Sequence, residues 1–293
     1  MKIFESTLFG SKAEATGILL FLALAVTPVV LGIIYALLYS LGLTGLVSDG
    51  FTLKYWSRSL GDPEFWLSIG YTFYIALTTI ALTILSALFL SLYLKKPLEK
   101  GLPAFSVYVP LAFPAIVVAF LAFQLASRSG LFSRLANAVG LVSGTAAFPE
   151  LVNDPFGIGI IGAHTFMAVP FFTLYFMNLY DQQNLSEICR VAQSLGASTW
   201  QQIRHLKIPM LLRRAFPTLT LYTIFVLGSY EIPLLLGRQT PQMMSVLVIR
   251  KLRRFNLSTI PEAYVAALVF IAIIFVVLIL IFKTKAFRYE LQE

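Results

Sequence analysis

Long apolar runs without charge dominate this sequence. A bilayer-spanning helix needs about 20 mostly apolar residues, and five runs contain no Asp, Glu, Lys or Arg, while a sixth contains only Glu231. The pattern therefore predicts an all-α membrane protein with six transmembrane helices. The expected spans are about 16–42, 65–94, 102–127, 156–180, 213–237 and 263–283, within one membrane domain (16–283) between a short N-terminus (1–15) and a tail (284–293).

Two other features of the uncharged stretches need an interpretation, one inside the first run and one outside the six spans. Ala23-Leu24-Ala25 resembles a signal-peptidase site, but the apolar run continues through Leu43, so we interpret the first run as a retained span. The segment 135–149 is short and rich in Gly, Ala and Ser, and it predicts an interfacial loop or a short helix.

Composition supports this class. Hydrophobic residues make up 58% of the 293 residues and charged residues only 12%, whereas soluble domains carry about 25% charged residues. This balance excludes an ordinary soluble enzyme and a nucleic-acid-binding chain. The single cysteine, Cys189, excludes an internal disulfide.

The basic residues indicate the orientation. Thirteen of the 22 Lys and Arg residues lie in segments that fall on the same side of the membrane as the N-terminus. This excess of basic residues favours both termini in the cytoplasm. The margin is reduced by Arg250, Lys251, Arg253 and Arg254, which fall on the other side. This cluster either anchors to lipid headgroups or meets an acidic face of a soluble protein.

The long loop between spans four and five, at 181–212, predicts two short amphipathic helices. Asn184 with Glu187 fits a capping box, Gly196 fits the residue that ends the first helix, and Ser198 with Gln201 fits a second cap. Pro209 is expected to break the second helix and open the next span. The apolar face of the first helix must be buried on lipid or in a soluble partner. That face carries Leu185, Ile188, Val191, Ala192 and Leu195.

The segment from Arg190 to Pro209 resembles the cytoplasmic signature of binding-protein-dependent ABC importer permeases. Gly196, Ala197, Ile203, Leu206 and Pro209 stand where that family has its glycine, alanine, large hydrophobic residues and proline. The family's leading Glu-Ala falls on Arg190 and Val191, and only Ala192 of the triplet matches. Span four also contains a similar pattern from His164 to Pro170, and residues 228–237 look most like the polyamine and ferric-iron branch.

This resemblance implies a type I importer subunit of the bacterial inner membrane. Its first loop helix would be the coupling helix that docks in a cytoplasmic ATPase. The docking residues would be Glu187, Ile188, Arg190, Val191, Ala192, Leu195, Gly196 and Ala197. Glu187 is also explained as a plain helix cap, and Arg190 is expected to alter the polar contact to the ATPase.

The resemblance also implies partners. Two ATPase subunits would bind ATP and Mg²⁺, because this chain has no phosphate-binding loop of its own. A second permease, identical or related, and an extracytoplasmic solute-binding protein would complete the importer. The implied solute is a polyamine, ferric iron or a similar small solute.

Three residues are candidates for the translocation path: His164, Tyr230 and Glu231. A carboxylate inside a span is usually functional, but Glu231 also fits a solvated position at the outer interface, and His164 also fits a structural hydrogen bond between helices. An ion-coupled carrier or channel that uses Glu231 is the alternative function. With two His and one Cys scattered along the chain, we see no catalytic constellation and no metal site, so an intramembrane enzyme ranks last.

Overall fold

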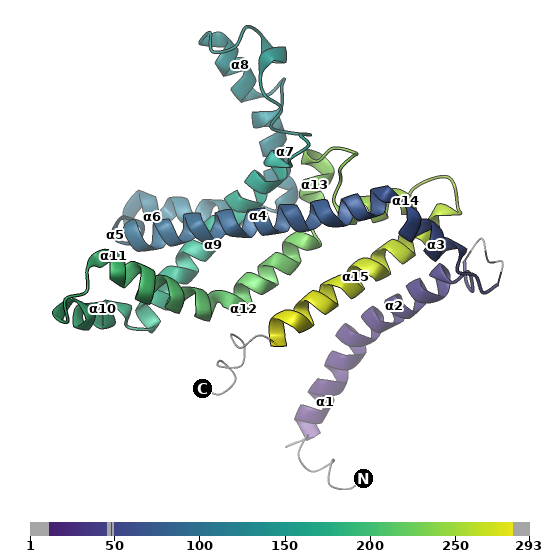
Figure 1. Ribbon diagram of the computed structural model, residues 1–293, viewed down its shortest axis with the longest axis horizontal. Coiled ribbons are helices and arrows are strands. Elements are labelled where there is room, and N and C mark those ends of the chain that lie inside the picture. The colour runs from purple at the N-terminus through teal and green to yellow at the C-terminus, as the bar shows by residue number, and fades with distance from the viewer. Residues whose placement is uncertain (1–11, 46–47, 49, 284–293) are drawn as a thin grey trace. The chain divides into compact units, whose positions relative to one another are not determined.

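All regular elements in the described part of the chain are helices (Figure 1). The structure is a computed structural model that describes residues 12–45, 48 and 50–283, so most of the predicted N-terminus and the whole tail 284–293 lie outside these residues. Six helices in it are long and apolar enough to cross a membrane, which confirms the predicted all-α fold with six spans. They are Thr16–Ser40, Pro63–Tyr93, Ala115–Ala138, Ile158–Gln182, Thr199–Leu227 and Thr259–Ile281. The segment Ala115–Ala138 consists of two consecutive helices that are separated at residues 127–130.

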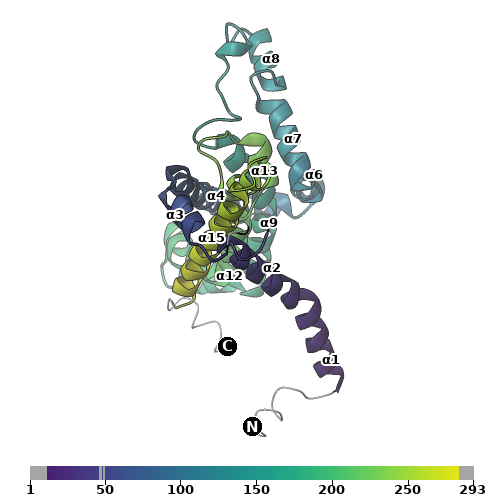
Figure 2. The same cartoon turned by 90° about the vertical axis from the view of Figure 1, so that its right-hand side faces the viewer.

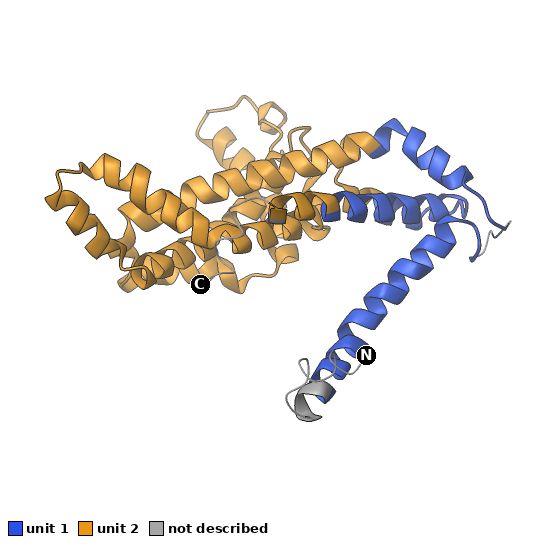
Figure 3. Cartoon of the chain, turned by 60° about the horizontal axis from the view of Figure 1, so that its bottom comes forward, with its two compact units in different colours: residues 1–65, 248–275 blue, residues 66–247, 276–293 orange. Residues whose placement is uncertain are grey.

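The chain forms two compact units (Figure 3). Unit 1 comprises residues 1–65 and 248–275, and unit 2 comprises residues 66–247 and 276–293. Two long helices, α4 (Pro63–Tyr93) and α15 (Thr259–Lys283), have residues in both units.

Unit 1 begins with α1 (Lys12–Phe21), a π-helical turn (Leu22–Val26) and α2 (Thr27–Ser40). The rings of Tyr35 and Tyr39 at the end of α2 both pack on Tyr264 of α15, with centroids 6.0 and 4.9 Å away. The short helix α3 (Lys54–Gly61) follows, and Trp56 Nε1 donates to Ser40 Oγ at 3.2 Å. Aromatic packing and this bond join α2, α3 and α15 within the unit.

Unit 2 has its core among α4, α9 (Ile158–Gln182), α10 (Leu185–Ser194) and α12 (Ile208–Leu227). Large side chains of α9 fill the centre, because Phe172 and Phe176 are fully buried. The whole buried cluster consists of Ala87, Leu88, Ala168, Phe172, Phe176, Leu179, Leu185, Leu211, Ala215 and Leu219.

The third predicted span, 102–127, is not one helix. After α5 (Lys95–Leu98), the chain forms α6 (Gly101–Tyr108), a 3-10 turn (Val109–Ala112) and α7 (Ala115–Ala126). Phe113 is extended, with ψ 129°, because the ring of Pro114 disfavours the helical conformation in the residue before it. The chain then continues into α8 (Leu131–Ala138), which begins before the predicted short helix, and a 3-10 turn (Thr145–Ala147) (Figure 2).

The fifth predicted span, 213–237, also differs. The helix α11 (Thr199–Gln202), a π-helical turn (Ile203–Lys207) and α12 follow without a break, so Pro209 does not end a helix. Pro209 lies in the first turn of α12, where the preceding π turn changes the register of the hydrogen bonds. At its other end the span stops at Leu227, and α13 (Glu231–Leu236) and α14 (Met244–Leu252) follow as separate short helices.

Candidate functional site

The helix α10 is fixed to the core of unit 2 by one face. Leu185 is fully buried in the cluster with α9 and α12, Cys189 is buried, and Ile188 packs partly against the cluster. Asn184, just before the helix, adopts a left-handed conformation with φ 48° and makes no side-chain cap. The predicted capping box at Asn184 is therefore wrong, because this backbone conformation uses Asn184 to turn the chain from α9 into α10.

The end of α10 is built as predicted. Gly196 has φ +88°, its N–H bonds to Gln193 O at 3.0 Å, and the N–H of Ala197 bonds to Ala192 O at 3.0 Å. This is the paired-bond motif that ends a helix at a left-handed glycine. Ser198 then caps α11, with Gln201 N to Ser198 Oγ at 3.3 Å and Ser198 N to Gln201 Oε1 at 2.8 Å. The two helices are thus joined by a turn with defined geometry.

The other face of α10 points away from the core. Val191 and Leu195 are 61% and 83% exposed, although both belong to the predicted apolar face. Glu187 lies one turn before Val191, and its carboxylate pairs with Arg190 at 3.3 Å. Glu187 therefore forms an exposed ion pair instead of a cap. We call Glu187, Arg190, Val191 and Leu195 the α10 outer face.

A second cluster of charges lies where the α5 segment meets the end of α9. Lys95 pairs with Asp181, lies 3.9 Å from Glu99, and stands over the ring of Tyr180 at 4.4 Å. Lys207 also approaches the Tyr180 ring, at 5.8 Å. Sequence reasoning missed this cluster, because Lys95 and Asp181 are 86 residues apart. These ion pairs and cation-π contacts are a second set of interactions that stabilise the region around α10.

The three predicted path residues do not form one group. His164 is fully buried in α9, its ring lies 6.4 Å from that of Phe225, and its carbonyl oxygen accepts a bond from Tyr222 Oη at 3.0 Å. Neither ring nitrogen has a hydrogen-bond partner in the part of the chain that the structure describes. Glu231 is exposed at the first residue of α13, directly after the half-buried Tyr230. In the described part of the chain, no hydrogen bond or ion pair joins His164 to Tyr230 or Glu231.

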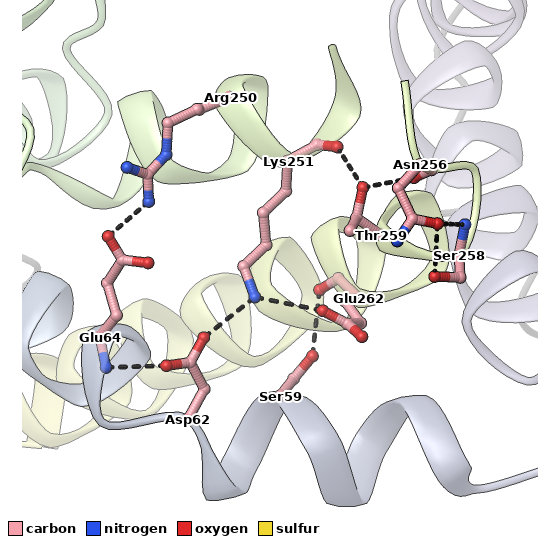
Figure 4. Close-up of polar contacts among 9 residues, drawn as sticks. All are labelled: Ser59, Asp62, Glu64, Arg250, Lys251, Asn256, Ser258, Thr259 and Glu262. Carbon is pink, nitrogen blue, oxygen red and sulfur yellow. Dashed lines mark hydrogen bonds and ion pairs between the residues drawn. The ribbon is translucent and has the colours of Figure 1, made fainter. Parts of the chain in front are cut away.

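Unit 1 contains a network of charges that sequence reasoning did not find. Lys251 Nζ lies 3.1 Å from Asp62 Oδ2 and 3.4 Å from Glu262 Oε2, and Arg250 pairs with Glu64 (Figure 4). We call these five residues the polar junction. They join the end of α3, the start of α4, the end of α14 and the first turn of α15, and the side chain of Lys251 is only 6% exposed.

The neighbouring backbone ties the same elements together. Ser59 Oγ donates to Glu262 O at 3.3 Å, and Thr259 Oγ1 donates to Lys251 O at 2.9 Å. Asp62 also accepts from the N–H of Glu64 at 2.9 Å and so caps α4. The Asp62-Pro63-Glu64 sequence, an N-cap followed by proline, is the local signal that could have predicted this helix start.

Comparison with known proteins assigns a class to this arrangement. Residues 84–285 match the family described as "Binding-protein-dependent transport system inner membrane component". This stretch covers more than half of the chain, so the chain belongs to that family. The assignment places it among inner-membrane transport components and not among enzymes, and it agrees with the six apolar helices.

Individual relatives agree with the class. The chain is 31% identical over 119 residues to the probable ABC transporter permease protein y4fN of Sinorhizobium fredii. The aligned segment covers 39% of this chain and 21% of that protein. The match thus spans about a fifth of the length of this relative.

Two solved structures share the fold. One is a bacterial alginate ABC transporter in complex with an alginate pentasaccharide-bound periplasmic protein, with TM-score 0.66 and 19% identity over 91% of this chain and 90% of that chain. The other is a bacterial ABC transporter involved in the import of alginate, with TM-score 0.65 and 19% identity over 93% of both chains. At this identity the likeness concerns the fold.

Proposed function

We propose that this chain is a transmembrane subunit of an ATP-driven solute importer. It would give alternating access across the membrane, with a second permease completing the path and a solute-binding protein delivering the solute. The family assignment of residues 84–285 supports the importer over the ion-coupled carrier, because the family is described as binding-protein-dependent. No covalent step is assigned to the chain.

The α10 outer face carries this proposal. An exposed pair of apolar side chains beside an ion pair is suited to a groove in a soluble partner, as in other cases where one helix face docks. The occupant would be a cytoplasmic ATPase subunit that binds ATP and Mg²⁺, two of which would serve the complete importer. The loop that carries α10 would then face the cytoplasm, together with both termini.

The anchoring of α10 explains how motion would pass to the membrane. Leu185 fixes α10 in the core between α9 and α12, so a displacement of α10 also displaces these helices. The helix from Thr199 to Leu227 runs over 29 residues, or about 43 Å at 1.5 Å per residue. ATP-dependent closure of the ATPases would bias the equilibrium between inward-open and outward-open states through these two attachments.

The experiment compares two leucines that are similarly exposed. Leu195→Asp places a charge on the α10 outer face, and Leu141→Asp places it after α8, where Leu141 is 78% exposed and Leu195 is 83% exposed. We expect Leu195→Asp to lose the ATPase on purification in mild detergent and to stop ATP-dependent uptake in vesicles, whereas Leu141→Asp keeps both. Equal ATPase recovery in the two variants would show that α10 is not the docking element.

The solute is a separate proposal. Residues 228–237 resemble the polyamine and ferric-iron branch, while the two importers with a similar fold act on alginate. The exposed carboxylate of Glu231 at the start of α13 favours a cationic solute over an acidic polysaccharide, because it would repel carboxylates. We therefore propose a polyamine, ferric iron or a similar small cation, with Tyr230, Glu231 and His164 near its path.

This solute proposal is tested by uptake assays with the complete importer in vesicles. Glu231→Gln should reduce uptake of labelled spermidine or ferric iron several-fold and leave the thermal stability of the protein unchanged. Uptake of labelled alginate oligosaccharide, with no uptake of either cation, would refute the cationic solute.

A further inference from the structure

Several hydrogen bonds stabilise the turn between α14 and α15. Asn256 Oδ1 accepts from the N–H and the Oγ of Ser258, at 3.1 and 2.8 Å, and Thr259 Oγ1 donates to Lys251 O at 2.9 Å (Figure 4). The N–H of Arg253 bonds to Ile249 O at 3.1 Å and extends the last turn of α14. Hydrogen bonds therefore hold both ends of the turn, at Arg253 and at residues 256–259.

The structure divides the four basic residues at this place into two pairs. Arg250 and Lys251 are neutralised by the carboxylates of the polar junction. Arg253 and Arg254 are exposed and form no ion pair with any residue that the structure describes. Two uncompensated positive charges therefore stand side by side on the turn.

An apolar side chain completes the turn. The next residue, Phe255, is fully exposed, at 105%. A phenylalanine of this kind gains free energy when it leaves water, and Phe255 directly follows the two unpaired arginines. The combination of guanidinium groups and an aromatic ring is typical of segments that bind the membrane interface.

The position of the turn along α15 sets its depth. The helix has 25 residues, or about 37 Å at 1.5 Å per residue, whereas the hydrocarbon core is about 30 Å thick. One end of α15 can therefore extend past the core, and because a charge inside the hydrocarbon is costly, we expect this to be the first turn, which contains Glu262. We then expect Arg253 and Arg254, a few residues earlier, near the level of the lipid phosphates.

We propose that the 253–255 turn is a binding site for the phosphate headgroup of an anionic phospholipid. The guanidinium groups of Arg253 and Arg254 bind the phosphate by charge-assisted hydrogen bonds, and the ring of Phe255 enters the boundary between headgroups and acyl chains. The proposal rests on the membrane-spanning role of α15, but it does not depend on the solute or on the docking of an ATPase.

A local probe tests the site in the full chain. The single cysteine, Cys189, is buried, so Cys189→Ala with Leu257→Cys places a fluorescent label beside the turn. The protein is reconstituted in nanodiscs that contain nitroxide-labelled phosphatidylglycerol or nitroxide-labelled phosphatidylcholine. We expect phosphatidylglycerol to quench the label at a mole fraction about 30-fold lower than phosphatidylcholine does, since each of the two basic residues near an anionic surface adds about one kcal/mol.

Two variants and one aqueous quencher complete the test. Arg253→Gln with Arg254→Gln should abolish the preference, whereas Arg253→Lys with Arg254→Lys should keep most of it, and thermal melting checks that both variants are folded. Equal quenching by the two lipids in the unchanged turn, or a preference that survives the Gln variant, overturns the proposal. Quenching by aqueous iodide alone also overturns it, because the turn would then lie in water, open to an acidic face of a soluble protein.

Discussion

Replacement of Lys251 by methionine tests the energetics of the polar junction. Met keeps much of the volume of the Lys side chain but removes its charge, so Asp62 and Glu262 lose the ammonium group that lies 3.1 and 3.4 Å from their oxygens. Both carboxylates stay largely enclosed, with side chains 28% and 16% exposed. The variant therefore leaves two negative charges facing one another.

The expected cost follows from this geometry. The distances to Lys251 place the two carboxylate oxygens no more than about 6.5 Å apart, and their repulsion at an effective dielectric constant of about 20 is then at least about 2.5 kcal/mol. Loss of one partner from a buried ion pair costs about 3–5 kcal/mol in general. Since Asp62 keeps some contact with water, we expect a loss near 3 kcal/mol in the free energy of unfolding.

Two further variants separate the ionic cost from a loss of packing. Arg250→Met breaks only the ion pair between Arg250 and Glu64, and both of these side chains are more than a quarter exposed. This variant should lower the free energy of unfolding by about 1 kcal/mol. The triple variant Asp62→Asn, Lys251→Met, Glu262→Gln removes all three charges, and it should recover most of the stability that the single Lys251→Met variant loses.

The assay is reversible unfolding in mixed micelles of mild detergent and SDS, followed by far-UV circular dichroism. A Lys251→Met variant as stable as the unchanged chain would refute the reasoning, and so would a triple variant no more stable than that single variant. In the first case the carboxylates are already solvated, and in the second the ammonium group contributes mainly by packing.

Three other changes address α10 and its turn. Gly196→Val places a β-branched residue at φ +88°, with an expected cost of about 1–2 kcal/mol in the free energy of unfolding. This variant should uncouple ATP hydrolysis from uptake. The control Gly140→Val, at φ +73° after α8, should carry a similar strain and leave uptake intact. Leu185→Ala should lower the free energy of unfolding by about 2–5 kcal/mol and make the amides of α10 exchange faster with deuterium than those of α12, because Leu185 is fully buried. Ser198→Ala should cost about 1 kcal/mol through loss of the cap on α11, measured by the same SDS titration, and no change would mean that water replaces the hydroxyl.

Local sequence signals determined much of this protein. The apolar runs predict six spans because a helix in a bilayer must satisfy its own backbone and expose only apolar side chains. The end of α10 at Gly196 and the cap at Ser198 were also predicted correctly, since both depend on residues within a few positions of each other. The resemblance around Gly196 led to the family that the match over 84–285 assigns.

Tertiary structure alone decided how these elements are used. The apolar pattern of α10 does not say that Leu185 enters the core while Leu195 points outward, because that division depends on how α9 and α12 pack against it. Likewise, Arg250 and Lys251 differ from Arg253 and Arg254 only through carboxylates up to 189 residues away. A periodic pattern records which side chains avoid water, whereas the choice of partner is fixed only when distant segments of the chain meet.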